Sequence, residues 1–512
     1  MRRLTYAITT AILLSLVLAC ATGRGHDGPN LRRLGGEDTV GGTAVAVAMS
    51  MEEPGRRLDA LAKVATAYLD ADRGDEARIL FEFVRDHETE GVEAHALADA
   101  LTSVGRGYAR LGDTENAAAV LERARRAASR ISSESSRVAV LARIVEAAFL
   151  PSPTLAETLQ ATIQDVYIVQ DFALRADFLL DLLERYRGTE VLGSVNTLIQ
   201  QTLPAASSIA DPWARALAFA RIARAQGPAG GELTEASRET LRRSLTAVEA
   251  AGEIASGTQA LAAHQLVSVL AAMDSREEAL RLVDRIPLGH LQSLSYVDLA
   301  RSYFREDTRA VGFLMLTRAG RSASLAESPA RRAEGHMAIA RAYHEIDEGS
   351  LARFQLGLAR TNAVAAESAS EKIRLLEETV ALYLEQDDDD EQAGIGVMNE
   401  IVAELPGGLV LARLRARVSE LLLDRGRRDE GAAQFREALV TLRGASETEP
   451  GFAVRMSRIA ARLDEIDLAI GIAASIPTPR SQIDALADII RWLPPAYRLS
   501  PTTQDSLRQI RS

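Results

Sequence analysis

The sequence is short of cysteine, lysine, aromatic side chains and positive charge. It has one cysteine among 512 residues, so no disulfide can form within the chain. Aromatic residues make up only 4%, and the basic side chains are almost all arginine, since lysine occurs only as Lys63 and Lys372. The net charge of −12 argues against a general nucleic-acid-binding protein, because such a protein needs a positive surface to displace phosphate counterions.

Sequence motifs of catalysis are also missing. No pair among the seven histidines has the HExxH or another zinc-ligand spacing, and the chain contains no GxxxxGK[ST], strand-linked GxGxxG or GxSxG motif. The sequence therefore predicts no catalytic residue, no metal site and no cofactor. An enzyme with an unfamiliar kind of site is the least favoured of the three function classes considered.

The composition that is present favours a helical protein. Hydrophobic residues make up 47% and charged residues 25%, which is ordinary for a soluble folded chain. Alanine, leucine and arginine dominate, and these residues suit closely packed helices better than strands. A chain of 512 residues is too long for one compact core, so several domains or a repeat array are expected.

The N-terminus has the architecture of a secretory signal. Residues 1–20 read MRRLTYAITTAILLSLVLAC: Arg2 and Arg3 form a positive region, Ala11 to Leu18 an apolar run, and Ala19 a small residue before Cys20. The apolar run is short for a membrane span. An uncleaved anchor helix, or an ordinary signal with an incidental cysteine, is the alternative.

The segment Val17-Leu18-Ala19-Cys20 resembles the lipobox of bacterial lipoproteins. The resemblance implies a signal peptide over residues 1–19, its removal, and acylation of Cys20 with fatty acids such as palmitate. Two or three acyl chains anchor a protein firmly, whereas one alone is marginal. By the same resemblance, Ala21 in place of an aspartate favours the outer membrane, facing the periplasm, over the inner membrane.

The segment after the cysteine is expected to be a flexible tether. Residues 20–50 are rich in glycine and show little hydrophobic periodicity before Val45. The tether would hold the folded body clear of the bilayer.

A forty-residue repeat fills the rest of the chain. VGRGY (104–108), LARSY (299–303) and IARAY (339–343) share one pattern, and each tyrosine is followed at nine, thirteen and sixteen residues by small or aliphatic side chains. We call the tyrosine place the reference position. Apolar residues at i, i+3 and i+4 before it, a turn after it and a second apolar face indicate two antiparallel helices. Reference positions at most 44 residues apart occur at 68, 108, 148, 186, 226, 270, 303, 343, 383, 422 and 463.

This pattern resembles the tetratricopeptide repeat family, most closely at Tyr108, Tyr303 and Tyr343. The family's usual unit has 34 residues, so these units are longer. The sequence therefore predicts an all-α fold: an α-α superhelix of about eleven helical hairpins over residues 51–493, stacked into a curved rod. Such hairpins must stack to bury their apolar faces. Residues 494–512 are expected to cap the array.

Four arginines stand two residues before a reference position: Arg106, Arg224, Arg301 and Arg341. In the tetratricopeptide family this position points into the concave groove, so the resemblance implies a basic stripe there. Arginine makes planar, two-bonded contacts with carboxylates, which suits an acidic segment or chain terminus of a partner. The alternative is that each arginine pairs with a carboxylate of the adjacent helix.

The function favoured by these features is a non-enzymatic, lipid-anchored scaffold of the bacterial cell envelope. It would bind another envelope or periplasmic protein in its groove, and no nucleic acid. The alternative is a helical ligand-binding lipoprotein subunit that encloses a small molecule or glycan.

Overall fold

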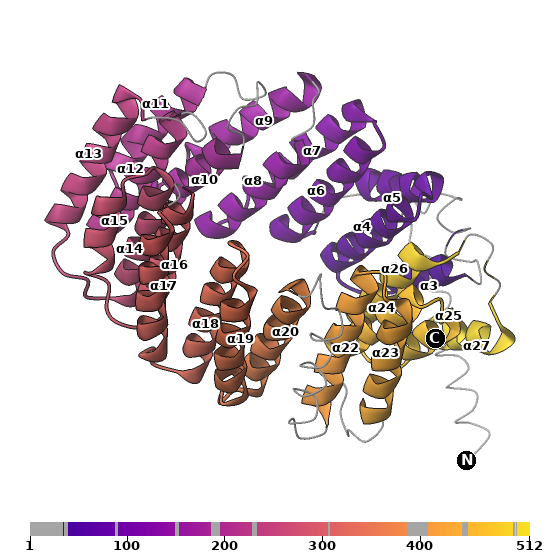
Figure 1. The fold of residues 1–512 in the computed structure, drawn as a ribbon. Helices are drawn as coiled ribbons and strands as arrows, with labels where there is room; N and C mark the ends of the chain where they lie inside the picture. The colour runs from indigo at the N-terminus through magenta and orange to yellow at the C-terminus, as the bar shows by residue number, and fades with distance from the viewer. Residues whose placement is uncertain are drawn as a thin grey trace, which may run out of the picture.

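The described part of the chain is built from helices alone. The computed structural model describes Leu34 and residues 39–511 except 88–90, 149–152, 186–194, 228–232, 306–307, 387–407, 443–448, 495–496 and 498. These residues form 24 helices and no strand (Figure 1). None of the helices in these ranges is long and apolar enough to cross a membrane. The predicted all-α fold of stacked, tetratricopeptide-like helical hairpins is confirmed.

The helices are arranged as a ring in which the first helix of each hairpin lies inside and the second outside (Figure 1). The twelve inner helices of the described chain are α4 (Pro54–Asp70), α6 (Ala94–Arg110), α8 (Glu134–Ala148), α10 (Phe172–Arg185), α12 (Pro212–Gln226), α14 (Gly257–Ala272), α16 (His290–Phe304), α18 (Pro329–His344), α20 (Ala369–Gln386), α22 (Leu409–Asp424), α24 (Pro450–Arg462) and α26 (Pro479–Trp492).

The outer helices pack against them. They are α5 (Gly74–Asp86), α7 (Thr114–Ala128), α9 (Pro153–Val166), α11 (Val195–Ser207), α13 (Glu235–Ala250), α15 (Arg276–Val283), α17 (Arg309–Ser324), α19 (Gly349–Val364), α23 (Arg428–Leu442), α25 (Ile466–Ala474) and, from the start of the chain, α3 (Val40–Met49). The last helix, α27 (Pro501–Arg511), lies on α25 and α3.

A recurring turn ends the inner helices. In α6, the N–H of Asp113 donates to the carbonyl of Tyr108 at 2.9 Å, and Gly112 between them has a φ of 76°. The same bond runs to Tyr343 from Glu348, with Asp347 at a φ of 62°. This is the Schellman geometry, which needs one left-handed residue, and glycine or aspartate takes that conformation most readily here. The turn explains why the helical pattern breaks four residues after the reference position.

Close packing explains the small residues before the reference position. A Cβ atom on Gly105 would lie 2.5 Å from Cδ2 of Leu121, so only glycine lets α6 and α7 approach this closely. The rings of Phe81 and Tyr108 join neighbouring units at a centroid distance of 5.7 Å. Each unit therefore buries its apolar face against the next one.

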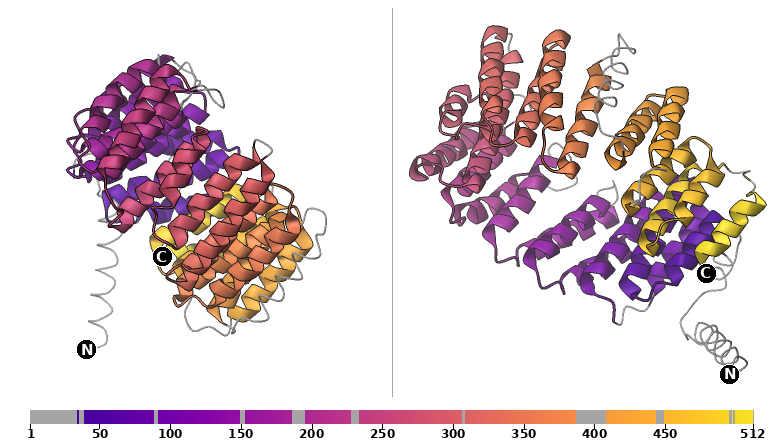
Figure 2. Two further views of the ribbon diagram at one scale, coloured as in Figure 1. Left: turned by 60° about the vertical axis from the view of Figure 1, so that its left-hand side comes forward. Right: turned by 90° about the horizontal axis from the view of Figure 1, so that it is seen from below.

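The two ends of the array meet and close the ring. Inner helix α26 packs against both α24 and α4, and α3 packs against α26 in the place of an outer helix (Figures 1 and 2). One hydrophobic core contains residues of both ends, among them Val45 and Ile489. Lys63 pairs with Asp484 at 3.0 Å, and Arg491 with Asp70 at 2.8 Å. A composite twelfth hairpin, α26 with α3, thus joins the first hairpin to the eleventh.

Three predictions need correction. The predicted curved rod closes into a ring, in which the composite unit of α26 and α3 follows the eleven predicted repeats. The predicted tether over 20–50 is wrong for residues 40–49, because α3 is helical there and eight of its residues are buried. The reference position of the eleventh unit is Ala460 and not Leu463, since the N–H of Glu465 bonds to the carbonyl of Ala460. Residues 1–19 and Cys20 lie outside the described part.

Candidate functional site

The inner side of the ring carries a ladder of ion pairs between successive inner helices. Each pair joins an arginine to a carboxylate about forty residues away, so it spans one seam between units. Pairs of this kind are Arg110–Asp70 at 2.8 Å, Arg143–Asp99 at 2.5 Å, Arg221–Asp181 at 2.5 Å, Arg374–Glu334 at 2.5 Å and Arg462–Asp424 at 2.8 Å. Arg491–Asp70 continues the ladder across the closure. The inner helices are thereby held in register by paired charges as well as by apolar packing.

Three of the four predicted groove arginines belong to this ladder. Arg301 makes two parallel bonds to Glu345 at 2.7 and 2.8 Å, which is the strong geometry for this pair. Arg341 contacts Glu378 at 2.6 Å. Arg106 lies 3.6 Å from Glu146, a looser contact between two half-exposed side chains.

The fourth arginine is different. Arg224 stands three residues after Arg221 on α12, so the two share one helix face. Among the described residues, no carboxylate lies within ion-pair distance of Arg224, whereas Arg221 contacts Asp177, Asp181 and Glu184. For Arg106, Arg301 and Arg341 the contacts agree with the alternative interpretation, in which each arginine pairs with a carboxylate of the neighbouring unit. A role of any of the four in partner binding stays a prediction.

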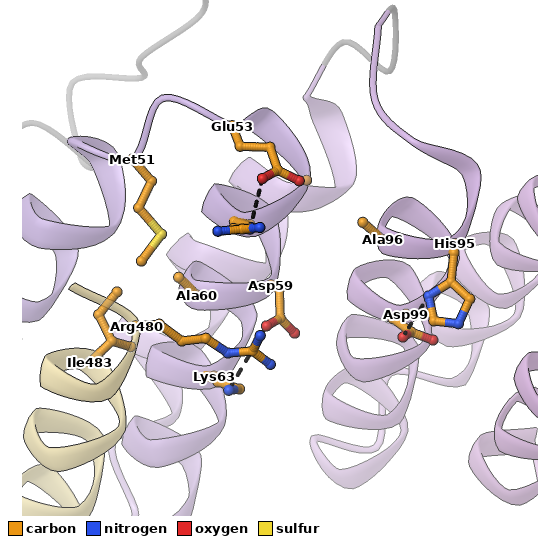
Figure 3. Close-up of a pocket in the computed structure, with 12 residues that line it drawn as sticks. Met51, Glu53, Asp59, Ala60, Lys63, His95, Ala96, Asp99, Arg480 and Ile483 are labelled. Atoms are coloured by element: carbon orange, nitrogen blue, oxygen red, sulfur yellow. Dashed lines mark ion pairs between the residues drawn. The ribbon is translucent and has the colours of Figure 1, made fainter. Parts of the chain in front are cut away.

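A cavity of about 320 Å³ lies where the ring closes (Figure 3). Its lining comes mainly from three inner helices: Arg480 and Ile483 from α26, Arg56, Asp59 and Lys63 from α4, and His95 and Asp99 from α6. Residues from opposite ends of the chain, such as Lys63 and Ile483, therefore line one cavity.

Most charges of this cavity are already paired. Arg56 contacts Glu53 at 2.7 Å, and His95 contacts Asp99 at 3.4 Å. Arg480 is exposed and reaches from α26 toward Lys63 (Figure 3), and the described residues offer it no ion pair. Sequence reasoning missed this site because the last reference position was assigned at 463, before α26. Pro479, a helix-start proline after the last reference position, was the available sign.

The described residues contain no group of three or more histidine, cysteine, aspartate and glutamate side chains arranged to hold a metal ion. The inner helices carry repeated arginine–carboxylate pairs. Among the described residues, Arg224 and Arg480 have no such pair and Arg106 has only a loose one. Such a surface can hold another chain through charge and hydrogen bonds.

Comparisons with known proteins yield only distant likenesses. No family model matches the chain, and no curated protein matches it. Among solved structures, Ton1535 from Thermococcus onnurineus NA1 is 12% identical, with a TM-score of 0.24 over 65% of this chain and 95% of that one. The human IFIT1 dimer with PPP-AAAA is 12% identical, with a TM-score of 0.24 over 79% and 94%.

A circular tandem repeat protein with a novel repeat topology is 14% identical, with a TM-score of 0.20 over 88% of this chain and 98% of that one. Because these identities and TM-scores are low, the fold is assigned from the repeat geometry of the chain itself.

Proposed function

From this closed ring of helical hairpins, we propose that the protein is a non-enzymatic scaffold of the bacterial cell envelope. Acyl chains on Cys20 anchor it in the membrane, with the outer membrane and the periplasmic side favoured by Ala21. It holds another envelope protein against the inner helices of the ring. The resemblance of residues 17–20 to a lipobox supports the anchor, and the helical repeats support the role in protein binding.

The observation that carries the proposal is the closure of the array by α3 and α26. An open solenoid must lose freedom when it wraps around a partner. A closed ring with seams held by apolar packing and ion pairs has already lost that freedom, so less ordering opposes binding. The inner helices therefore form a preorganised protein-binding surface.

The available cations indicate an acidic partner segment. Arg301 and Arg341 are engaged in short pairs, but Arg224 and Arg480 have no ion pair among the described residues and Arg106 is only loosely paired. These three arginines lie on the inner helices α6, α12 and α26. A carboxylate of a partner can bind to Arg224 or Arg480 without displacing a carboxylate of this chain, and at Arg106 it would replace only the loose contact with Glu146.

The test is site-specific photocrosslinking in the native envelope, with a photoreactive residue in place of Arg106 or Arg224. The control is the same replacement at Arg126, an arginine 72% exposed on the outer helix α7. We expect the same partner protein to be crosslinked at positions 106 and 224, and we expect no crosslink to that protein at position 126. The same adducts at all three positions, or none anywhere, would contradict binding at the inner face.

The anchor is tested separately by Cys20→Ala. We expect the wild-type chain to take up labelled palmitate and to fractionate with membranes, and the variant to lose both properties while its helix content stays unchanged. A label that persists in the variant would show that Cys20 is not the acylated residue.

A further inference from the structure

One inner helix interrupts the charge ladder. Helix α14 reads GTQALAAHQLVSVLAA and contains no aspartate, glutamate, lysine or arginine. The ladder reaches Arg221 on α12, which contacts three carboxylates of α10, and resumes at Arg301 on α16. The inner side is thus locally uncharged around α14, which lies beside α16 in Figure 1.

A cavity of about 510 Å³ opens at this interruption. Its walls are the first half of α14, the Pro287–Leu288 connection and the first half of α16, and they are mainly aliphatic. Leu261 on α14 is 46% exposed and Leu288 is 67% exposed. Exposed leucines that line a cavity leave apolar area that a ligand can remove from water. The volume lies within the usual range of about 300 to 1,000 Å³ for sites of small molecules.

His264 supplies the polar group that could make this cavity selective for one kind of ligand. Its Nδ1 lies 3.0 Å from Oγ of Ser295, and that Oγ also lies 2.8 Å from the carbonyl oxygen of Leu291. The hydroxyl has one hydrogen and the carbonyl can only accept it, so Nδ1 must donate to Oγ for both contacts to be hydrogen bonds. The proton of a neutral His264 is therefore on Nδ1, and Nε2 presents a lone pair. No hydrogen bond to Nε2 comes from the described residues.

The histidines of this cavity are neutral at neutral pH. Burial lowers the pKa of His264, against the opposing effect of Asp298. Burial also lowers the pKa of His290, whose Nε2 lies 3.4 Å from Glu334. Neither ring therefore offers a positive charge to an anion.

The remaining charges at the rim are paired with one another. Arg331 contacts Glu334 at 2.8 Å and Glu327 at 4.0 Å, and Arg374 also contacts Glu334. A charged ligand would have to break one of these pairs or remain unpaired in an apolar cavity, which is costly. The charge balance favours an uncharged occupant.

We propose that this cavity, between α14, α16 and the start of α18, is a binding site for a small, uncharged, largely apolar molecule that carries one O–H or N–H group. The apolar body lies against Leu261, Leu288, Leu291 and Leu294, and the donor group bonds to Nε2 of His264. Arg106, Arg224 and Arg480 do not line this cavity. The proposal of a ligand site therefore does not depend on the protein-binding role.

The test compares three naphthalene compounds by calorimetric titration of the full chain at pH 7. 2-Naphthol is uncharged and has one donor, 2-methoxynaphthalene is uncharged without a donor, and 2-naphthoate is an anion. We expect 2-naphthol to bind about threefold to tenfold more tightly than 2-methoxynaphthalene, which is the worth of one neutral hydrogen bond. We expect 2-naphthoate to bind more weakly than both.

Two variants locate the site. His264→Phe should abolish the preference for 2-naphthol, and Leu288→Asp should weaken both uncharged compounds about tenfold. Val440→Asp is the control, because Val440 is 63% exposed on outer helix α23, away from the cavity. If His264→Phe does not fold, Leu261→Asp at an already exposed position replaces it. Equal affinities for all three compounds, no measurable binding, or equal effects of Leu288→Asp and Val440→Asp would overturn the proposal.

Discussion

At the scale of single residues, a left-handed residue after several inner helices marks the turn between the two helices of a hairpin. Gly112 occupies it with a φ of 76°, and no atom lies within 4 Å of where its Cβ would be. Any penalty for a side chain there is therefore conformational and not steric. Aspartate takes the same place at Asp72, Asp274, Asp347 and Asp464.

Gly112→Ala should destabilise the α6–α7 hairpin by about 1–2 kcal/mol, the cost of holding a non-glycine residue in the left-handed region. Gly320→Ala is the matched control, because its surroundings are equally open but it lies inside helix α17. That change should stabilise α17 by about 0.5–1 kcal/mol. Hydrogen exchange of the two hairpins measures both effects, and a loss of protection of equal size in both variants would contradict the explanation.

Glu93 gives a residue-scale prediction that depends on pH. The N–H groups of Ala96 and His95 donate to its carboxylate at 3.0 and 3.1 Å, and these bonds lower the pKa of Glu93 from its usual 4.5. A lowered pKa means that the folded state binds the proton less readily than the unfolded state. The stabilisation is therefore present at neutral pH and is lost as the pH falls below about 4.5.

Glu93→Ala should speed hydrogen exchange at the start of α6 at pH 7, corresponding to about 0.5–1 kcal/mol for an exposed cap. The difference from the wild type should shrink at pH 3, below the usual pKa of 4.5, because proton binding by the carboxylate of the unfolded chain then opposes the cap. An unchanged difference at pH 3 would show that the cap does not act through its charge.

At the scale of elements, the sequence was sufficient for the hairpins and insufficient for their closure. The apolar spacing before Tyr108, Tyr303 and Tyr343 predicted the inner helices because it is local information. The spacing was less decisive in α24, where Leu463 lies three residues after Ala460 on the same helix face and was mistaken for the reference position. A three-residue shift keeps helical periodicity, so only the turn hydrogen bond distinguishes the two registers.

Helix α3 could not be predicted from its own residues. Its sequence, VGGTAVAVAM, is short and has two glycines in its first turn, features that resemble a linker. Gly41 is explained by contact and not by local preference: a Cβ there would lie 1.8 Å from Oη of Tyr68 on α4. Burial against α26 and α4 makes this segment helical.

Gly41→Leu should therefore displace α3 and open the ring. We expect an increase in the radius of gyration by X-ray scattering with little loss of helix content, because the other hairpins keep their neighbours. Gly357→Leu is the control, since no atom lies within 4 Å of a Cβ at this place in α19. An unchanged radius in Gly41→Leu would contradict the closing role of α3.

At the scale of the whole molecule, closure distinguishes this chain from an open solenoid. The ring fixes the spacing of its inner helices, and the segment that would lead from Cys20 ends in α3, at the closure itself. The closing helix and the cavity lined by Arg480 thus lie in one region of the ring. Sequence reasoning identified four arginines of the inner helices but not this region, because its residues come from opposite ends of the chain.

The shortage of lysine makes closure directly measurable. Carbodiimide joins lysines to carboxylates in contact with them, and the chain has only Lys63 and Lys372 to react. Lys63 Nζ lies 3.0 Å from Asp484 and 3.9 Å from Asp59. After treatment and digestion of the monomer, the closed ring predicts a peptide that joins Lys63 to Asp484, across 421 residues of sequence. If Lys63 is found crosslinked to Asp59 alone, and to no residue of α26, the result would contradict the closed ring.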